Sequence, residues 1–153
     1  MVNYNNSIIY KLCCKDINVK DIYVGSTTNF NRRKQKHKQM VEYGFKKDGE
    51  YNTKVYNFIR DNGDWDNWQM IQIEQYSATN KRDLEKRERY WLEKLKATLN
   101  TNKPFTTNDE KNNYYKKRKQ NKIYCKFCDS SFDKYFEKKH NITKNHIINF
   151  IYF

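Results

Sequence analysis

Residues 7–25, SIIYKLCCKDINVKDIYVG, decide how this 153-residue chain begins to fold. Two runs in this stretch, 7–14 and 21–25, are short and rich in β-branched and aromatic residues, and a polar segment with Lys15 and Asp16 separates them. Runs of this composition, joined by a few polar residues, are typical of the two strands of a β-hairpin. We therefore expect the chain to begin with an antiparallel hairpin.

An amphipathic helix is predicted directly after the hairpin. Residues 25–29 supply turn residues and a helix N-cap, and Ser26 and Thr27 are predicted to be turn and capping residues rather than nucleophiles. The face that this helix presents to the core contains Arg33 and His37 among its apolar residues. A polar or charged side chain on such a face is costly unless it is paired or binds a ligand, so both mark a candidate site.

A short helix and a third strand are predicted next. The helix covers residues 53–60, and its inner face is formed by Val55, Phe58 and Ile59. After a turn that contains a glycine, residues 68–76 form the strand.

A longer helix follows from Lys81, with Thr79 or Asn80 as its N-cap. Its core-facing stripe is apolar except for Glu88. The cost of a carboxylate at such a position adds Glu88 to the candidate site.

These elements predict an α+β fold over residues 7–104, with a small three-stranded antiparallel sheet flanked by helices. Residues 105–121 change in composition to Asn, Lys and Tyr, which is typical of a solvated basic linker or a basic helix. Residues 122–153 are predicted to form a separate module.

The charge of the chain favours a polyanionic partner. Lys and Arg number 31 against 18 Asp and Glu, which gives a formal net charge of +13. We therefore expect a nucleic acid as the partner. No apolar run is long enough to span a membrane, so no membrane association is expected. Four cysteines at irregular spacing do not resemble a disulfide framework, which favours a reducing intracellular location, cytoplasm or nucleus.

The C-terminal module carries the ligand spacing of a zinc finger. Two cysteines two residues apart are followed by two histidines, at Cys125, Cys128, His140 and His146. Tetrahedral zinc takes two thiolates from a tight turn and two imidazoles from one helix, and this spacing supplies both. We therefore predict a Cys2His2-like finger with a structural Zn²⁺; the alternative is an unfolded basic tail with two free thiols.

Basic side chains before and within the finger are predicted to contact DNA. They are Lys116, Lys117, Arg118 and Lys119 in the basic segment and Lys138, Lys139 and Lys144 in the finger helix. A nonspecific clamp on phosphates and a contact in the major groove are both open alternatives. The apolar end, residues 147–153, is expected to pack on a partner subunit, which would give self-association, or on a continuation of the chain.

The polar residues of the first domain resemble a known family when they are taken in order. They are Ser-Ile-Ile-Tyr at residues 7–10, Tyr-Val-Gly-Ser at 23–26, Arg33-x3-His37, and Glu88 in an Arg-Glu-Arg-Tyr-Trp context. This set, over residues 7–100, resembles the GIY-YIG nuclease family, which includes homing endonucleases, restriction enzymes and excision-repair nucleases. Ile8 stands where the family has its first Gly, but the Tyr10 hydroxyl is kept, so we expect activity to survive.

The resemblance implies an endonuclease that hydrolyses phosphodiester bonds, with double-stranded DNA as its partner and with no small-molecule cofactor. Glu88 is the expected ligand of one catalytic Mg²⁺ or Mn²⁺, because such ions use only one or two carboxylates and one is visible here. Arg33 is expected to grip the phosphate through its planar donor fork. A single site of this kind nicks one strand at a time.

Further roles are implied by the family alone. The family tyrosine that matches Tyr10 is its proposed general base, with the one that matches Tyr23 in support. We expect the surrounding cations to lower the pKa of Tyr10 for this task. His37 is expected to relay a proton or to hold the Tyr23 hydroxyl, and Asn100 resembles a family asparagine that steadies the site.

The sequence leaves alternatives open. A second site histidine found in some family members is absent, and either Tyr51 or Lys54 is a candidate to replace it. Arg33 and Glu88 are alternatively a structural ion pair with each other. The whole protein is alternatively a catalytically inactive DNA-binding or scaffold protein that keeps the nuclease fold, and RNA is an alternative substrate.

Overall fold

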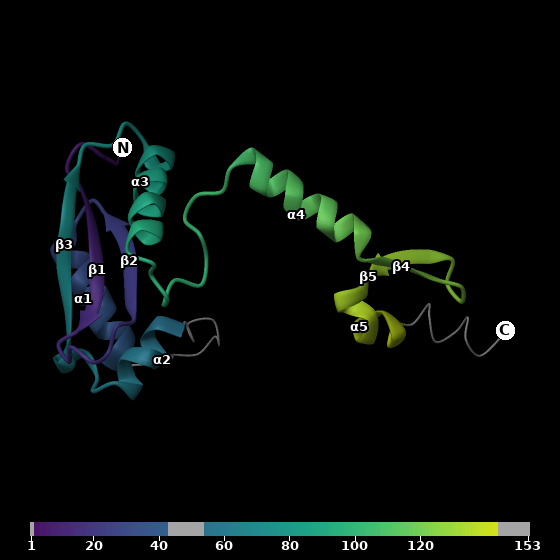
Figure 1. The fold of residues 1–153 in the computed structure, drawn as a ribbon, viewed down its shortest axis with the longest axis horizontal. Helices are drawn as coiled ribbons and strands as arrows, with labels where there is room; N and C mark the ends of the chain where they lie inside the picture. Colours follow the sequence, from purple (N-terminus) through teal and green to yellow (C-terminus); the bar gives the residue numbers. More distant parts are fainter. Residues whose placement is uncertain (1, 43–53, 144–153) are drawn as a thin grey trace. The chain divides into compact units, whose positions relative to one another are not determined.

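The computed structural model describes residues 2–42 and 54–143, and it divides the chain into two compact units. The first unit is Met1–Phe105 and the second is Thr106–Phe153. Each unit has its own strands and helices (Figure 1).

The first unit is built on a three-stranded antiparallel sheet in the order β2-β1-β3. The strands are β1 (Ser7–Cys14), β2 (Ile22–Thr27) and β3 (Trp68–Tyr76). β1 is the central strand and pairs with both neighbours, which places Tyr10 opposite Gly25. The predicted hairpin and third strand are thus confirmed.

β2 is longer than the sequence analysis predicted. Ser26 and Thr27 were expected in a turn, but they pair with Ile9 and Ile8 of β1 as strand residues. Because β1 continues past them toward Ser7, the ladder holds both residues in extended conformation despite their polar side chains.

Helices cover both faces of this sheet (Figure 1). They are α1 (Phe30–Glu42), α2 (Lys54–Asp61) and α3 (Lys81–Lys94), and a 3₁₀ turn, η1 (Trp65–Asn67), precedes β3. The side chains of Tyr10 and Leu12 share a core with α1 and α2, whereas Ile9 and Val24 share one with α3. The predicted α+β fold, a small antiparallel sheet flanked by helices, is therefore correct.

Side-chain caps fix where two of the helices begin. Asn29 accepts a hydrogen bond from the backbone N–H of Arg32, and Asn80 accepts one from the backbone N–H of Asp83. Caps of this kind satisfy N–H groups that have no partner within the helix.

The second unit begins with a helix, which decides between the two alternatives for the basic segment. α4 (Asn108–Gln120) starts at a capping box, in which Thr107 and Glu110 bond to each other's backbone N–H. None of its residues is buried. At its end Arg118 forms an ion pair with Asp133 at 3.0 Å, which ties the helix to the hairpin that follows.

That hairpin consists of β4 (Lys122–Cys125) and β5 (Ser130–Asp133), and η2 (Lys134–Phe136) and α5 (Glu137–Asn141) come after it. The two strands pair antiparallel. Within the described ranges, no helix combines the length and the apolar character needed to cross a membrane.

Candidate active site and metal centre

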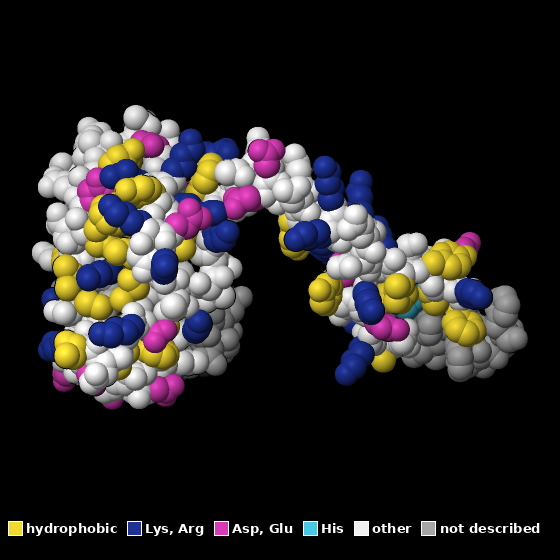
Figure 2. Space-filling model, in the orientation of Figure 1, with side chains coloured by type: hydrophobic (Ala, Val, Ile, Leu, Met, Phe, Trp, Pro, Cys, Tyr) yellow, Lys and Arg dark blue, Asp and Glu magenta, His cyan; other side chains and the backbone are white. Residues whose placement is uncertain are grey.

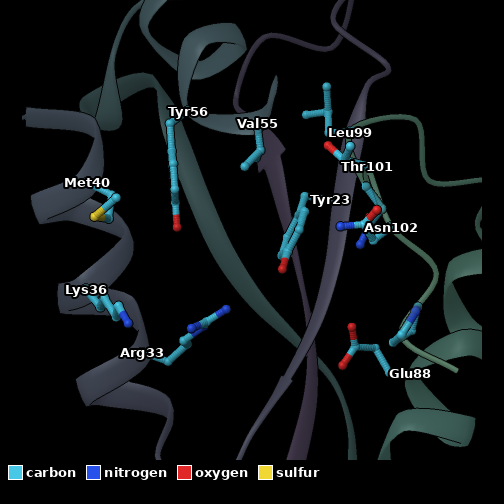
Figure 3. A pocket seen from close by; sticks show the side chains of 12 residues that line it. Tyr23, Arg33, Lys36, Met40, Val55, Tyr56, Glu88, Leu99, Thr101 and Asn102 are labelled. Atoms are coloured by element: carbon cyan, nitrogen blue, oxygen red, sulfur yellow. The ribbon is translucent and has the colours of Figure 1, made fainter. Parts of the chain in front are cut away.

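A pocket of about 320 Å³ in the first unit collects most of the predicted site residues (Figure 3). Its walls come from β2, α1, α2, α3 and the segment after α3. They are formed by Tyr23, Arg33, Lys36, Met40, Val55, Tyr56, Glu88, Leu99, Asn100, Thr101, Asn102 and Pro104. Residues far apart in the sequence therefore meet around one space, and Arg33 and Glu88 face each other across it.

A chain of hydrogen bonds runs beneath the floor of this pocket. The Nε of Arg33 donates to the hydroxyl of Tyr10 at 2.9 Å, and this hydroxyl lies 2.8 Å from Nε2 of His37. The other ring nitrogen of His37, Nδ1, lies 3.0 Å from the hydroxyl of Tyr56. Tyr10 and His37 are only 0% and 1% exposed, so the polar groups of this chain depend on one another.

This arrangement corrects one predicted role of His37. Both of its ring nitrogens are occupied, by Tyr10 and by Tyr56, so the histidine does not hold the Tyr23 hydroxyl. Its ring packs edge-on against Tyr23 instead, with centroids 5.8 Å apart.

Gly25 makes the position of Tyr10 attainable. A Cβ atom at residue 25 would lie 2.5 Å from the Tyr10 hydroxyl and 3.0 Å from the ring of Tyr23. Carbon atoms do not approach other atoms so closely, and only glycine lets the phenol lie over the backbone of β2. Ile8, where the family has its first Gly, is an ordinary strand residue packed on the core.

Burial controls the ionisation of the buried chain. It raises the pKa of the Tyr10 hydroxyl above its usual value, and the guanidinium of Arg33 offsets this only in part. The expectation that nearby cations lower the pKa of Tyr10 is therefore wrong for this site. Burial, together with the charges of Arg33 and Lys36, lowers the pKa of His37 to about 3, so the imidazole is neutral near pH 7. Burial likewise raises the pKa of Tyr56 to about 12.

The two hairpin tyrosines have different access to the pocket. Tyr23 lines the pocket, whereas Tyr10 is fully buried and does not. The cause is the strand order, since Tyr10 lies on the central strand and Tyr23 on the edge strand β2. Burial and the Glu88 carboxylate raise the pKa of Tyr23, and Arg33 opposes them.

Glu88 projects from α3 into the pocket opposite Arg33 (Figure 3). Its carboxylate accepts a hydrogen bond from the hydroxyl of Ser26 at 2.5 Å. Burial raises the pKa of Glu88, although Ser26 and Arg33 oppose the shift. No ion pair joins Arg33 and Glu88 in the described part of the chain, so the alternative of a structural bridge is wrong.

Asn100 completes the free edge of β2. Its side-chain oxygen accepts from the backbone N–H of Val24 at 2.9 Å, and its amide donates to the carbonyl of Val24 at 2.7 Å. The backbone N–H of Leu99 also bonds to the carbonyl of Ile22. The segment after α3 thus pairs with the strand that carries Tyr23.

Of the two candidates for a replaced histidine, the structure describes only Lys54. Lys54 donates to the carbonyl of Thr98 and does not line the pocket, and Tyr51 lies outside the described residues. The partner of His37 on α2 is Tyr56, which the sequence analysis missed. Tyr56 lies three residues before Ile59 on the inner face, and this spacing was the available signal.

Lys36 and Ser26 were also missed. Lys36 lies one turn after Arg33 and lines the pocket, a spacing that puts both cations on one side of α1. Nothing in the composition distinguishes Ser26 from a turn serine, because its role depends on where α3 packs.

The second unit brings three of the four predicted zinc ligands together. The ligand atoms of Cys125, Cys128 and His140 all lie within 4.8 Å of one another, and Sγ of Cys128 is 3.3 Å from Nε2 of His140. Ligands at tetrahedral zinc–sulfur and zinc–nitrogen distances lie about 3.4–3.8 Å apart, so the three fit one ion. His146 lies outside the described residues.

Neighbouring groups favour the thiolate form of Cys125 and hold the ring of His140 in place, and both effects suit metal binding. Burial opposes ionisation of Cys125, but hydrogen bonds from Cys128 and Phe127 outweigh it and lower the pKa of the Cys125 thiol. The ring of Phe132 stacks on His140 at 3.8 Å between centroids, which fixes the orientation of the imidazole.

The predicted DNA contacts of the second unit are solvent-exposed where they are described. Lys116, Lys117, Arg118 and Lys119 are exposed on α4, and Lys138 and Lys139 are exposed on α5. Figure 2 shows basic side chains along α4. Arg118 is partly engaged by Asp133, and Lys144 and the apolar residues 147–153 lie outside the described residues.

Comparison with known proteins assigns the first unit. A family model described as the GIY-YIG catalytic domain matches residues 6–103. No curated protein and no solved structure matches the chain. The matched stretch is well over half of the chain, and it contains the whole pocket except Pro104. The chain therefore belongs to the GIY-YIG nuclease family.

Proposed function

We propose that this protein is a metal-dependent DNA endonuclease that nicks one strand at each active site. The observation that carries the proposal is the convergence of Tyr23, Arg33 and Glu88, from three different elements, around one pocket. A phenol, a guanidinium and a carboxylate are the groups that phosphodiester hydrolysis needs for water activation, charge stabilisation and metal binding.

Arg33 would bind the scissile phosphate. Its Nε is held by Tyr10, and its terminal nitrogens point across the pocket toward Glu88 (Figure 3). An anchored guanidinium loses little freedom when it binds a phosphate through two parallel hydrogen bonds. Lys36 adds a second positive charge to the same wall.

Tyr23 is the phenol that we assign to the attacking water. It faces the pocket, whereas Tyr10 is buried beneath it and contacts Arg33, which lines the pocket. Tyr10 would then position Arg33 rather than take a proton from water. This assignment exchanges the roles that the family resemblance gives to the two tyrosines.

Glu88 would hold the catalytic Mg²⁺ or Mn²⁺. It is the single carboxylate among the described residues that line the pocket, and ions of this kind keep several waters and need only one or two carboxylates. When bound, the ion would relieve negative charge at the phosphoryl oxygens. The Ser26 hydroxyl would orient the carboxylate.

The second unit would hold the DNA. Cys125, Cys128 and His140, with His146 as the fourth ligand, would bind a structural Zn²⁺. The exposed basic residues of α4 and α5 would contact phosphates, and such contacts are independent of sequence.

Nicking of supercoiled plasmid tests the proposal. The purified full chain should convert supercoiled to open-circular plasmid in Mg²⁺ or Mn²⁺ and should stop when a chelator is added. Glu88→Gln should abolish nicking and keep DNA binding, because it removes the charge but little volume. Glu85→Gln is the matched control, since it lies one turn earlier on the same helix and outside the pocket. Equal behaviour of Glu88→Gln and the parent would overturn the proposal and leave a DNA-binding protein with a nuclease fold.

A further inference from the structure

The buried hydrogen-bond chain begins and ends at the pocket. Arg33 and Tyr56 both line the pocket, and Tyr10 and His37 connect them underneath it. The proposed function uses only the Arg33 end. The other end is a hydroxyl on α2 with no role so far.

Arg33 fixes the direction in which protons are donated along this chain. A guanidinium has donors and no acceptor, so the Tyr10 oxygen must accept from it. The Tyr10 hydroxyl is fully buried and needs an acceptor for its own proton, and Nε2 of His37 lies 2.8 Å away.

The same reasoning continues through the imidazole. A neutral histidine has one donor and one acceptor nitrogen, and His37 is neutral because burial lowers its pKa to about 3. If Nε2 accepts from Tyr10, then Nδ1 carries the proton and donates to the oxygen of Tyr56. The Tyr56 hydroxyl, which keeps its proton because its pKa is raised to about 12, is left to donate elsewhere.

We propose that Tyr56 is a substrate-binding residue whose hydroxyl donates to a phosphate oxygen of the bound nucleic acid. Its acceptor side is occupied by His37, and the ring lies in the wall of the pocket (Figure 3), so the proton points to where a phosphodiester would bind. Arg33 and Tyr56 then hold the substrate from the two ends of one polarised chain, in which each hydrogen bond strengthens the next. This inference rests on the proposed function, because it assumes that the pocket binds a phosphodiester.

The tautomer of His37 tests the direction of the chain without any nuclease activity. The zinc-loaded full chain, labelled with ¹⁵N, has three histidines, and a His37→Gln sample identifies the signals of His37. At neutral pH we expect a protonated Nδ1 and an unprotonated Nε2. A proton on Nε2, with Tyr10 donating to Tyr23 instead, would overturn the inference.

Tyr56→Phe tests the phosphate contact, because it removes one oxygen and keeps the ring. DNA affinity, measured without divalent metal, should fall about tenfold, the size expected for a hydrogen bond to a charged group. Tyr76→Phe is the matched control, since its hydroxyl bonds to Asp83 away from the pocket, and it should change affinity by less than about twofold.

Equal affinities of Tyr56→Phe and Tyr76→Phe would overturn the contact. These outcomes differ from failure of the nuclease proposal. In that case the parent protein would not nick plasmid in the presence of Mg²⁺ or Mn²⁺, but the tautomer of His37 and the affinity for DNA could still be measured.

Discussion

At the scale of single residues, the pocket depends on polar groups that the core would ordinarily exclude. Tyr10, His37 and the inner part of Arg33 lie under the pocket floor, and each is tolerated because the next one satisfies it. A chain that is fully paired is rigid, whereas one unpaired member would carry a large desolvation cost. The residues under the pocket floor therefore depend on one another, and a substitution of one should disturb the hydrogen bonds of the others.

Gly25→Ala should destabilise the first unit by about 1–3 kcal/mol, because the new methyl group would lie 2.5 Å from the Tyr10 hydroxyl. Tyr10→Phe removes that oxygen but keeps the ring carbon Cζ, which would lie 2.6 Å from the new methyl group. The clash is relieved in part, so the double variant should lose somewhat less stability than the sum of the two single variants. Urea unfolding of the parent, the two single variants and the double variant measures the coupling energy between residues 10 and 25. Strict additivity would show that the phenol oxygen is not what excludes a side chain at residue 25.

His37 should make stability depend on pH in acid. Its pKa is about 3 in the folded protein and near 6.5 when unfolded, so between these values only the unfolded chain binds the proton. The stabilising contribution is present above about pH 6.5 and is lost as pH falls toward 3, by up to about 1.4 kcal/mol per pH unit. The free energy of unfolding, measured with urea at pH 7 and at pH 5, should therefore fall less between the two pH values for His37→Gln than for the parent. An equal fall in the free energy of unfolding for both proteins would contradict a neutral buried imidazole.

At the scale of elements, two strands, three helices and the segment after α3 each supply part of the site. Tyr23 comes from an edge strand, Arg33 and Lys36 from α1, Tyr56 from α2 and Glu88 from α3. Edge strands normally leave backbone groups unpaired, but the segment at Asn100 covers part of the edge of β2. The alignment of Tyr23 thus depends on a residue 77 positions later in the chain.

Asn100→Ala should loosen this edge. The variant leaves the backbone N–H and carbonyl of Val24 without their side-chain partner, at a cost of about 1–3 kcal/mol. Hydrogen exchange should show faster exchange of the Val24 amide, and nicking should slow because Tyr23 is the adjacent residue. Asn102→Ala removes the same kind of side chain two residues along and serves as the control. If both variants exchange alike at Val24, the edge is held by something other than Asn100.

The sequence was most informative about elements with strong periodicity. β1 and β3 begin and end where alternation and composition predicted, and Arg33, His37 and Glu88 were recognised as costly residues on apolar faces. The sequence did not predict that Tyr10 is buried and Tyr23 faces the pocket, because this difference depends on β1 being the central strand. Periodicity within a segment carries no information about strand order.

The missed residues share one physical cause. Tyr56 carries no charge, so its spacing to Ile59 marked it as a residue of the inner helical face and not as a site residue. Its role arises from the place where α2 approaches α1, and Ser26 likewise matters only because α3 packs over β2. Such contacts follow from tertiary packing, which a single sequence does not specify.

At the scale of the whole molecule, catalysis and DNA holding are assigned to different units. Every residue that lines the pocket belongs to the first unit, and Cys125, Cys128 and His140 belong to the second. The second unit is small and has few buried residues, so a metal ion would be a large part of its stability.

Cys128→Ser should therefore separate the two activities. The variant should lose zinc and bind DNA more weakly, with a shallower dependence of affinity on salt. At saturating DNA its nicking rate should stay close to that of the parent, because the pocket is intact. Elemental analysis, salt titration of DNA affinity and plasmid nicking measure the three effects. A rate that stays low at saturating DNA would mean that the finger takes part in catalysis itself.

The late position of Glu88 and Asn100 has a consequence for synthesis on the ribosome. The hairpin and α1 emerge first and already carry two phenols and a guanidinium, but they lack the carboxylate and the covered strand edge. Under the proposed function, a nascent chain would be unable to cut the nucleic acids around it until nearly the whole first unit has left the exit tunnel. The order of the residues along the polypeptide would then act as a built-in delay on a toxic activity.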